Sequence, residues 1–436
     1  MMPAMQKLRR LLVRALRRLR PLVPQWFVNY AYHLPLAILA ARMYGNPGQD
    51  LEIIGVTGTD GKTTTSSLIY HILRLSHKKV ALISTVEAKI GRQSIDTGFH
   101  VTTPDPFLLQ RLLRRIKSQK IRYVVLEVTS HGLDQFRFYP LRPQIAVLTN
   151  ITHEHLDYHQ TFENYKNAKL KLFRHAAHAV VNKDLPIFTE INQQLSRVLF
   201  STYSIASASQ LQAEDVTPIP GGMSFRVGKI TYKIPLTGTY NVANALAAIS
   251  VALLLEISPS DIKRALMSFP GVKGRLEPVA NARGLHAYVD FAHTPHALES
   301  VLANIAMQKK KSERLIVVFG AAGERDGSKR PLMGAAAAQY ADKIVITSED
   351  PRSEDPATIA QEIISGIPES ARSKVKVELD RQAAIDLAVN KLAKPGDWII
   401  VCGKGHEQSM NLDGYTETPW SDHDALASAL KAKKSV

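Results

Sequence analysis

A glycine-rich heptapeptide, Gly58-Thr59-Asp60-Gly61-Lys62-Thr63-Thr64, stands between an apolar run over residues 51–57 and a helix-type pattern over residues 64–75. Glycines let successive backbone N–H groups face a phosphate, and the start of a helix adds positive potential. The lysine can reach the outer phosphates of a nucleotide, and the hydroxyl after it can bind Mg²⁺. The first glycine of the usual P-loop spacing would fall at Val56, so the alternative is a chance Gly-Lys-Thr turn. The strand–loop–helix context favours nucleotide binding by the heptapeptide.

Further polar side chains follow two other apolar runs. Glu127 ends the run over residues 123–127, and His153, His155 and His159 follow the run over residues 145–149. In open α/β sheets ligands bind at the carboxyl ends of the strands, and a carboxylate there suits Mg²⁺. Histidines in a loop are more often surface residues, so these three gain weight only from the neighbouring strand ends.

Strands and helices in alternation must position these motifs, and the sequence has that pattern. The first apolar runs alternate with helix-type patterns over residues 64–75 and 106–118. Short alternating strands around residues 221–234 and a helix over residues 241–255 precede a second series, with strands over residues 287–291, 315–319, 343–347 and 398–402. The pattern predicts α/β domains with mostly parallel sheets. We expect an N-terminal segment (residues 1–49), a P-loop domain (50–272) and a Rossmann-like domain (273–436).

The composition is that of a globular protein and excludes several other classes. With 436 residues, of which 45% are hydrophobic and 22% charged, the chain is unlike a disordered, collagenous or coiled-coil protein. A single cysteine, Cys402, excludes a disulfide framework and any cysteine-cluster zinc site. Lys and Arg number 55 against 39 Asp and Glu, and this formal charge of +16 favours a polyanionic partner.

Half of that excess lies in the N-terminal segment, where eight basic residues precede the first acidic residue, Asp50. Helical spacing over residues 7–20 places five leucines on one arc and seven basic side chains opposite, which predicts a basic amphipathic helix. Residues 21–41 are uncharged, but two prolines, an asparagine and a histidine interrupt them, so we do not expect them to span a membrane.

Two interpretations of the basic helix remain open, and nucleic-acid binding ranks third. It can contact a membrane surface, or it can be a cationic face packed on the protein's own core. Nucleic acid is not expected as a partner, because no aromatic-interleaved basic motif occurs elsewhere. A site for ATP implies the cytoplasm, at the inner face of the membrane if the helix binds lipid.

The heptapeptide resembles the P-loop of the Mur ligase family, which has the form Gly-Thr-(Asn/Asp)-Gly-Lys-(Thr/Ser)-Thr. Further motifs follow in the family's order up to about residue 410, and they are most similar to members that add the third residue of the peptidoglycan stem. The resemblance implies an ATP-dependent ligase that joins a diamino acid to UDP-N-acetylmuramoyl-L-Ala-D-Glu through an acyl phosphate. ATP and two Mg²⁺ ions are the implied cofactors. The implied ATP contacts in this loop are Gly58, Thr59, Asp60, Gly61, Lys62, Thr63 and Thr64.

The resemblance also implies a set of metal ligands. Glu154-His155-Leu156-Asp157-Tyr158-His159 is similar to the family's Asp-His-Leu-Asp-Tyr-His motif, and Lys169 occupies the place of a lysine that CO₂ carbamylates. Thr63 and Glu127 would hold one Mg²⁺, and Glu127, His155 and carbamylated Lys169 the other. The implied catalytic residues are Lys62, Glu127, His155 and Lys169. The alternative for Lys169 is a solvated lysine beside Lys166 and Lys171.

Two motifs resemble the family's acceptor-binding loops. Thr102-Thr103-Pro104 is similar to its Thr-Thr-Pro loop, and the segment from residue 130 to residue 137 is similar to Ser-Ser-His-Gly-Leu-x-Gln-His-Arg. The implied contacts are Thr102, Thr103, Ser130, Gln135 and Arg137. An arginine fork suits a carboxylate, and hydroxyls suit sugar and phosphate groups. Each residue alone could equally be a helix cap or a surface hydrogen bond.

The remaining motifs concern ATP and the incoming amino acid. Asn241, Arg275 and Asp290 are the implied further contacts to ATP, and because they come from both expected domains, domain closure should precede chemistry. For the amino acid the resemblance implies Arg325, Asp350, Arg352, Gly403 and Glu407. The family's Asp-Asn-Pro-Arg motif belongs to enzymes that use meso-diaminopimelate, and it reads Glu349-Asp350-Pro351-Arg352 here. Because the arginine is kept, we favour meso-diaminopimelate over L-lysine.

Family members with three domains place a domain of about 100 residues before the P-loop to bind the UDP end of the substrate. Residues 1–49 do not resemble it, so we expect uridine recognition to be supplied differently, lost, or replaced by a partner or a membrane-bound substrate. Another ligase of this fold is one alternative, either a folylpolyglutamate synthase, which lacks the Thr-Thr-Pro and Asp-Pro-Arg motifs, or the lipid II amidating enzyme, which usually carries a four-cysteine zinc insert. The second alternative is a non-catalytic nucleotide-binding scaffold. Such a protein would not need the four implied catalytic residues together, and their joint presence argues against it.

Overall fold

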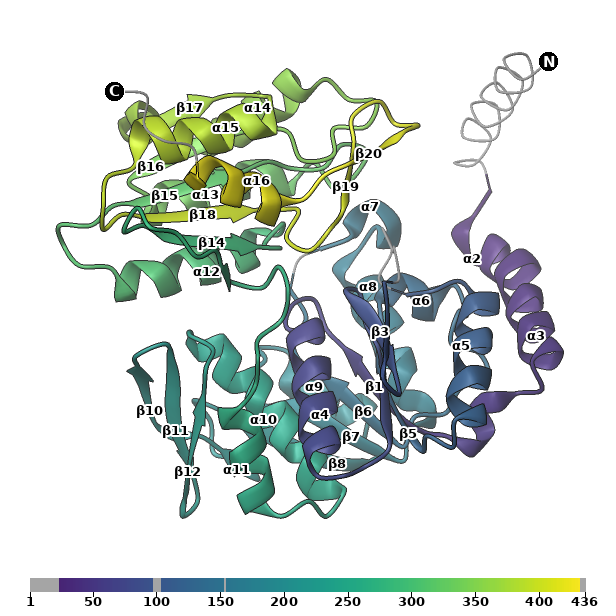
Figure 1. Ribbon diagram of the computed structural model, residues 1–436. Coiled ribbons are helices and arrows are strands. Elements are labelled where there is room, and N and C mark those ends of the chain that lie inside the picture. Colours follow the sequence, from purple (N-terminus) through teal and green to yellow (C-terminus); the bar gives the residue numbers. More distant parts are fainter. Residues whose placement is uncertain (1–22, 97–102, 153, 432–436) are drawn as a thin grey trace.

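The computed structural model describes residues 23–96, 103–152 and 154–431 (Figure 1). The predicted basic helix over residues 7–20 lies outside these residues, as do Thr102 and His153. The described chain forms two α/β halves, drawn in purple to teal and in green to yellow in Figure 1. This arrangement confirms the predicted fold class.

A nine-stranded sheet forms the centre of the first half. Its order is β4 (Gln93–Asp96), β3 (Glu87–Ile90), β2 (Val80–Ile83), β5 (Tyr123–Glu127), β1 (Glu52–Thr57), β6 (Ile145–Leu148), β7 (His178–Asn182), β8 (Leu199–Ser204) and β9 (Leu211–Gln212). Neighbouring strands in the part of this order that runs from β2 through β5, β1, β6, β7 and β8 to β9 are parallel. Strands β3 and β4 are antiparallel additions at the edge next to β2. Strand β1 therefore lies between β5 and β6, and the polar residues that follow these strands meet at one edge of the sheet.

Helices cover both faces of this sheet. Alternate side chains of β1 point to opposite faces, so Ile54 packs with α4 (Lys62–Leu75), α10 (Thr239–Leu254) and α11 (Pro259–Met267), while Ile53 packs with α5 (Pro106–Ser118) and α8 (Phe162–Leu170). A small antiparallel sheet of β10 (Glu214–Ile219), β11 (Gly222–Val227) and β12 (Ile230–Ile234) extends the first of these cores. Double-sided burial explains why the strands are continuously apolar.

The second half has a six-stranded sheet in the order β13 (Glu277–Pro278), β14 (His286–Asp290), β18 (Trp398–Cys402), β15 (Leu315–Phe319), β16 (Lys343–Ile346) and β17 (Val375–Val377). All pairs are parallel except β13 with β14. One face packs against α12 (Pro295–Gln308), α13 (Lys329–Tyr340) and α14 (Pro356–Ser365), and the other against α15 (Arg381–Leu387) and α16 (Asp422–Lys431). Strands β14, β15, β16 and β18 match those predicted from the sequence to within a residue or two, whereas β13 and β17 were not predicted.

A helix precedes the first strand and lies along α5 (Figure 1). It consists of α2 (Gln25–Val28), a π-helical turn, η2 (Asn29–His33), and α3 (Leu34–Met43). Of the residues predicted to interrupt this stretch, Asn29, His33 and Pro35 lie within the helix, whereas Pro24 precedes it. A π-helical turn breaks the regular hydrogen-bond ladder just before Pro35, which has no N–H to donate. Within the described ranges, no helix is both long and apolar enough to cross a membrane.

Candidate functional site

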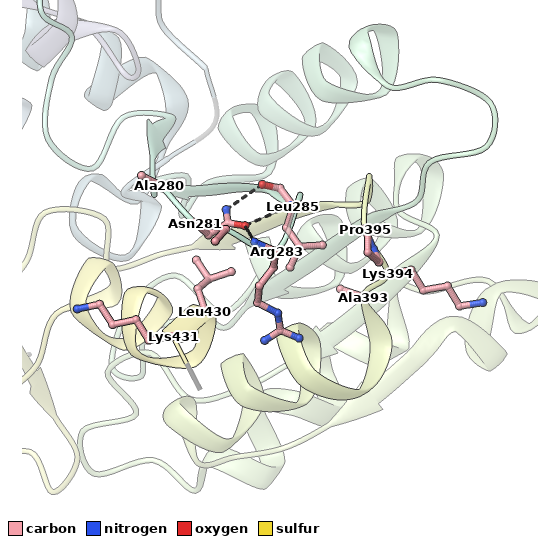
Figure 2. A pocket seen from close by; sticks show the side chains of 10 residues that line it. Ala280, Asn281, Arg283, Leu285, Ala393, Lys394, Pro395, Leu430 and Lys431 are labelled. Carbon is pink, nitrogen blue, oxygen red and sulfur yellow. Dashed lines mark hydrogen bonds between the residues drawn. The ribbon is translucent and has the colours of Figure 1, made fainter. Parts of the chain in front are cut away.

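Two cavities mark possible binding sites. The smaller, of about 590 Å³, lies within the second half and is flanked by Arg283, Lys394 and Lys431 (Figure 2). The Arg283 guanidinium, however, donates to Asn390 Oδ1 at 2.6 Å and to the Val389 carbonyl at 3.2 Å, so it is already engaged in hydrogen bonds within the protein. The larger, of about 950 Å³, lies between the two halves and is lined by the P-loop, α10 and α12. It is therefore the candidate site.

The P-loop is held from the neighbouring strand β6. Asn150 Oδ1 accepts hydrogen bonds from the N–H groups of Thr59 at 3.0 Å and Asp60 at 2.8 Å, and Thr149 Oγ1 donates to the Asp60 carbonyl at 2.6 Å. Gly61 begins α4 at φ 78°, and a Cβ there would lie 2.3 Å from Asn244 Oδ1. The loop is thus fixed by Thr149 and Asn150, which sequence reasoning did not single out although Thr149 ends a predicted strand and Asn150 directly follows it.

Three side chains meet at the start of α4. Thr63 Oγ1 donates to Glu127 Oε1 at 3.0 Å, and Arg275 Nη2, from the connection to the second half, donates to Thr63 Oγ1 at 3.2 Å. Glu127 is only 3% exposed, and its Oε2 accepts from the Thr85 N–H at 3.0 Å. A hydroxyl beside a buried carboxylate is a fitting partial shell for Mg²⁺, which takes its other ligands from phosphates and water.

Two lysines lie against the same loop. Lys62 Nζ donates to the Thr59 carbonyl at 2.6 Å, and Lys169 Nζ donates to the Gly58 carbonyl at 2.6 Å. Lys169 is 1% exposed, with its ammonium nitrogen 4.3 Å from the centre of the Tyr165 ring. Burial, and then the charge of Lys62, lower the pKa of Lys169 well below its ordinary value. Lys169 therefore readily loses its proton, as a lysine that reacts with CO₂ must.

Three histidine rings and one tyrosine ring, from the segments that follow β5 and β6, form a cluster. The His131 ring lies 4.7 Å from that of His155, 4.2 Å from that of Tyr158 and 5.3 Å from that of His159. Burial is the main cause that lowers the pKa of His131 to about 3 and that of His159 to about 4, and it also lowers the pKa of His155. All three imidazoles are neutral at pH 7, which is the form that binds metals.

The predicted metal ligands come from the same region without forming a complete protein shell. In the ranges the structure describes, no three histidine, cysteine or acidic side chains converge as a metal site. His155 Nδ1 lies 3.8 Å from Glu154 Oε1, whereas Thr63 and Glu127 bond each other. Such an open set fits a cation that is completed by nucleotide phosphates and water.

The other predicted ATP contacts border the larger cavity. Asn241 Nδ2 donates to the Thr237 carbonyl at 2.8 Å, and Asn241 Oδ1 accepts from Asn244 Nδ2 at 3.1 Å. Asp290 accepts from the N–H groups of Leu276 at 2.6 Å and Ala292 at 2.7 Å. Burial raises the pKa of Asp290, and Arg275 opposes that shift. The two halves thus each supply one polar wall of this cavity.

Three of the described acceptor candidates, Thr103, Gln135 and Arg137, are joined in one hydrogen-bond network. Arg137 donates through Nε and Nη2 to Gln135 Oε1, at 3.0 and 2.7 Å, and through Nη1 to the Thr103 carbonyl at 2.8 Å. Ser130 begins α6 (Ser130–Asp134), and its buried hydroxyl has no hydrogen-bond partner. An unpartnered buried hydroxyl costs free energy, so Ser130 is suited to meet a ligand.

The amino-acid candidates lie at the carboxyl edge of the second sheet. Lys404, 1% exposed, donates to both Asp350 oxygens at 2.9 and 3.0 Å and also pairs with Glu407. Arg352 Nη1 donates to the Gly323 carbonyl at 3.0 Å, and Gly403, at φ 112°, leaves room for the Glu349 carboxyl. Burial and then the Arg352 charge lower the pKa of Arg325. Sequence reasoning missed Lys404, which organises this group.

Comparison with known proteins identifies the family. Residues 56–252 match the Mur ligase middle domain, and residues 274–405 match the Mur ligase glutamate ligase domain. The UDP-N-acetylmuramoyl-L-alanyl-D-glutamate--2,6-diaminopimelate ligase of Syntrophomonas wolfei is 41% identical over 408 residues, which are 91% of this chain and 82% of that protein. The chain belongs to the Mur ligase family.

Other Mur ligases show the same relationship. The enzyme of that name from Clostridium botulinum is 40% identical over 87% of this chain and 78% of its own length. A solved structure of such a ligase has a TM-score of 0.61 at 30% identity, covering 90% of this chain and 81% of that one. A folylpolyglutamate synthase of Mycobacterium tuberculosis has a TM-score of 0.68 at 17% identity, covering 85% and 92%, and thus shares the fold.

Mur ligases are ATP-dependent amide ligases that use Mg²⁺, and this chain is one of them. Membership accounts for a P-loop that faces a second α/β half across a large cavity. It also makes the scaffold alternative superfluous, and Lys62, Glu127 and Lys169 all bond to residues of the P-loop.

Proposed function

We propose that this Mur ligase joins meso-diaminopimelate to UDP-N-acetylmuramoyl-L-Ala-D-Glu, with hydrolysis of ATP to ADP and phosphate. The observation that carries the proposal is the convergence of the P-loop, strand β5 and the interdomain connection on one hydroxyl, Thr63 Oγ1. The names of relatives at 37–41% identity supply the substrate class.

The proposed reaction has two steps. The glutamyl side-chain carboxylate of the acceptor attacks the γ-phosphorus of ATP, which gives an acyl phosphate and releases ADP. The amine of the diamino acid then attacks the acyl carbon, loses a proton and expels phosphate, so an amide forms. The first step brings negative groups together, and Lys62 with the P-loop N–H groups would offset that charge.

Thr63 and Glu127 would hold one Mg²⁺, and Glu127, His155 and Lys169 a second. Bound there, Mg²⁺ would neutralise charge on the phosphates. We include the carbamate of Lys169 in the proposal because its buried amine is readily neutral and lies against the P-loop. The carbamate would turn a cation into an anion and so remove a charge that repels the metal.

Arg352 would select the amino acid by pairing with the distal carboxylate that diaminopimelate has and lysine lacks. The replacement of the family's asparagine by Asp350 does not oppose this choice. Lys404 binds both Asp350 oxygens, so the extra negative charge is neutralised inside the protein. Arg325 would hold a second carboxylate of the diamino acid through its guanidinium.

Ligation by the purified protein tests the proposal. The protein is incubated with MgATP, UDP-N-acetylmuramoyl-L-Ala-D-Glu and either meso-diaminopimelate or L-lysine, and the product is identified by mass spectrometry. We expect product with diaminopimelate, and Arg352→Ala should raise its KM about tenfold or more without changing the KM of ATP. Equal use of both amino acids would overturn the specificity, and ATP binding without product would overturn the reaction.

We also propose that the chain contacts the inner face of the membrane through residues 7–20. Seven basic side chains there suit anionic lipids, and the adjacent helix α2 exposes Trp26 and Phe27 by 64% and 51%. Sedimentation with phosphatidylglycerol vesicles should retain the full chain and lose a variant with Arg14, Arg17 and Arg18 changed to Gln. Equal sedimentation of both proteins would contradict this proposal.

A further inference from the structure

A buried asparagine in the N-terminal helix bonds to the region of the acceptor candidates. Asn29, the first residue of the π-helical turn, is 4% exposed, and its Nδ2 donates to Asp134 Oδ2 at 2.6 Å. Gln25 Nε2 donates to Asn29 Oδ1 at 2.7 Å and to Tyr158 Oη at 2.9 Å. The side-chain amides of Gln25 and Asn29, one helical turn apart, thus donate hydrogen bonds to Tyr158 and Asp134, which lie more than 100 positions later in the chain.

The hydrogen bonds continue from there to the acceptor candidates. Tyr158 Oη donates to Asp134 Oδ2 at 3.0 Å and accepts from Gln135 Nε2 at 3.4 Å. Gln135 Oε1 in turn accepts two hydrogen bonds from Arg137, one from Nε and one from Nη2. The path Asn29–Asp134–Tyr158–Gln135–Arg137 is therefore continuous, and each step is a direct contact.

The chemistry of Asn29 suits this place. Asp134 is 19% exposed, and Lys171 already balances its charge at 2.5 Å. Asp134 Oδ2 therefore needs a donor that brings no further charge. The primary amide of Asn29 is such a donor, and its Oδ1 accepts from Gln25 at the same time. The helix is also anchored beside the path, because Tyr30 packs edge-on against Phe136 at 5.1 Å between ring centres. π-Helical turns occur frequently at functional sites.

We propose that Asn29 is a positioning residue of the acceptor site, which acts through Asp134 and Tyr158 to fix Gln135 and Arg137. The proposal rests on the proposed function, since it assigns Arg137 to the acceptor. The N-terminal helix is then one wall of the acceptor site and holds the arginine fork in the orientation that an anionic acceptor group requires. An apolar residue at position 29 leaves Asp134 Oδ2 with Tyr158 Oη as its single donor and removes the acceptor that holds Gln25 beside Tyr158.

The test uses the full chain with Asn29→Leu, an apolar side chain of similar shape, and Leu39→Ala as the matched control, because Leu39 is 50% exposed on the same helix. Amide hydrogen exchange over residues 130–137 should be at least about tenfold faster in Asn29→Leu and unchanged in the control and at the P-loop. Equal exchange rates in Asn29→Leu and the unaltered chain would overturn the proposal, whatever the substrate.

Calorimetry gives the second readout. Without ATP, the Kd of UDP-N-acetylmuramoyl-L-Ala-D-Glu should rise about tenfold in Asn29→Leu, while the Kd of ATP stays constant. The exchanged pair Asn29→Asp with Asp134→Asn keeps an amide–carboxylate bond and should recover part of the affinity. An equal rise in both Kd values would show a merely structural role and overturn the proposal. Failure of the unaltered chain to bind the acceptor would instead overturn the proposed function and, with it, the acceptor role of Arg137.

Discussion

Lys329 and Glu154 form an ion pair across the two halves of the molecule, with Nζ 3.4 Å from Oε1 and each side chain 5% exposed. Lys329 begins α13 in the second half, and Glu154 follows β6 in the first. Glu154 Oε2 has no hydrogen-bond partner, and burial raises the pKa of Glu154. The sequence marks Glu154 as a departure from the family's aspartate but gives no hint of its partner. The pair joins the halves next to His155.

Breaking this pair should destabilise the protein. Lys329→Met leaves the Glu154 carboxylate buried without its cation, which costs about 3 kcal/mol. Urea unfolding measures the loss. Lys309→Met is the control, because Lys309 pairs with Asp342 at 3.3 Å where the carboxylate is 42% exposed, and such pairs contribute below about 1 kcal/mol. The double variant with Glu154→Gln should regain part of the stability, and equal effects of Lys329→Met and Lys309→Met would contradict the interpretation.

A methyl group at Gly61 should weaken ATP binding. Gly61→Ala places Cβ 2.3 Å from Asn244 Oδ1 at φ +78°, so the loop and the first turn of α4 must shift. We expect the Kd of ATP, measured by calorimetry, to rise more than about tenfold, which corresponds to about 1.4 kcal/mol. Gly228→Ala has a similar φ of +57° with no atom within 4 Å, and it should leave the Kd unchanged. Unchanged binding in Gly61→Ala would show that the loop can relax.

Lys169 should take up CO₂ while its neighbour Lys166 does not. Both side chains are 1% exposed, but burial lowers the pKa of Lys169, whereas the ion pairs with Glu163 and Glu190 outweigh burial and raise the pKa of Lys166. Only a neutral amine attacks CO₂, so carbamate should form near pH 7.5 and disappear as acid protonates Lys169. Carbon-13 NMR in labelled bicarbonate should show a signal that Lys169→Ala removes and Lys166→Met retains. A signal that survives Lys169→Ala would refute the assignment.

Glu349 should make stability fall as pH rises. Burial raises its pKa from an ordinary value of 4.5 to about 7, and its Oε2 has no hydrogen-bond partner. Between these two values the folded protein holds a proton that the unfolded chain has lost, so the free energy of unfolding decreases with pH by up to about 1.4 kcal/mol per pH unit. Urea unfolding of Glu349→Gln between pH 5 and pH 7 should lack this part of the slope. The exposed Glu369→Gln should keep it, and identical slopes in both variants would exclude Glu349 as the cause.

The sequence by itself determined the α/β alternation, the P-loop and the family. Continuous apolar runs predict strands buried on both faces, and the glycine-rich turn between the first strand and α4 fixes where phosphates can bind. These features are local in the chain, so residue type and spacing are enough. Arg275 and Asn241 could be expected near ATP only through the resemblance, but the structure places both on the larger cavity, which lies between the two halves.

Only the tertiary structure decided which distant side chains meet and with what charge. Two lysines three positions apart, Lys166 and Lys169, differ because α8 turns one toward two glutamates and the other toward the P-loop carbonyl. Asn29, which the sequence presents as an interruption, bonds to Asp134 because a π-helical turn faces it inward. Hydrogen bonds and pKa shifts depend on distances of a few ångströms between segments far apart in the chain, and the order of residues does not specify such distances.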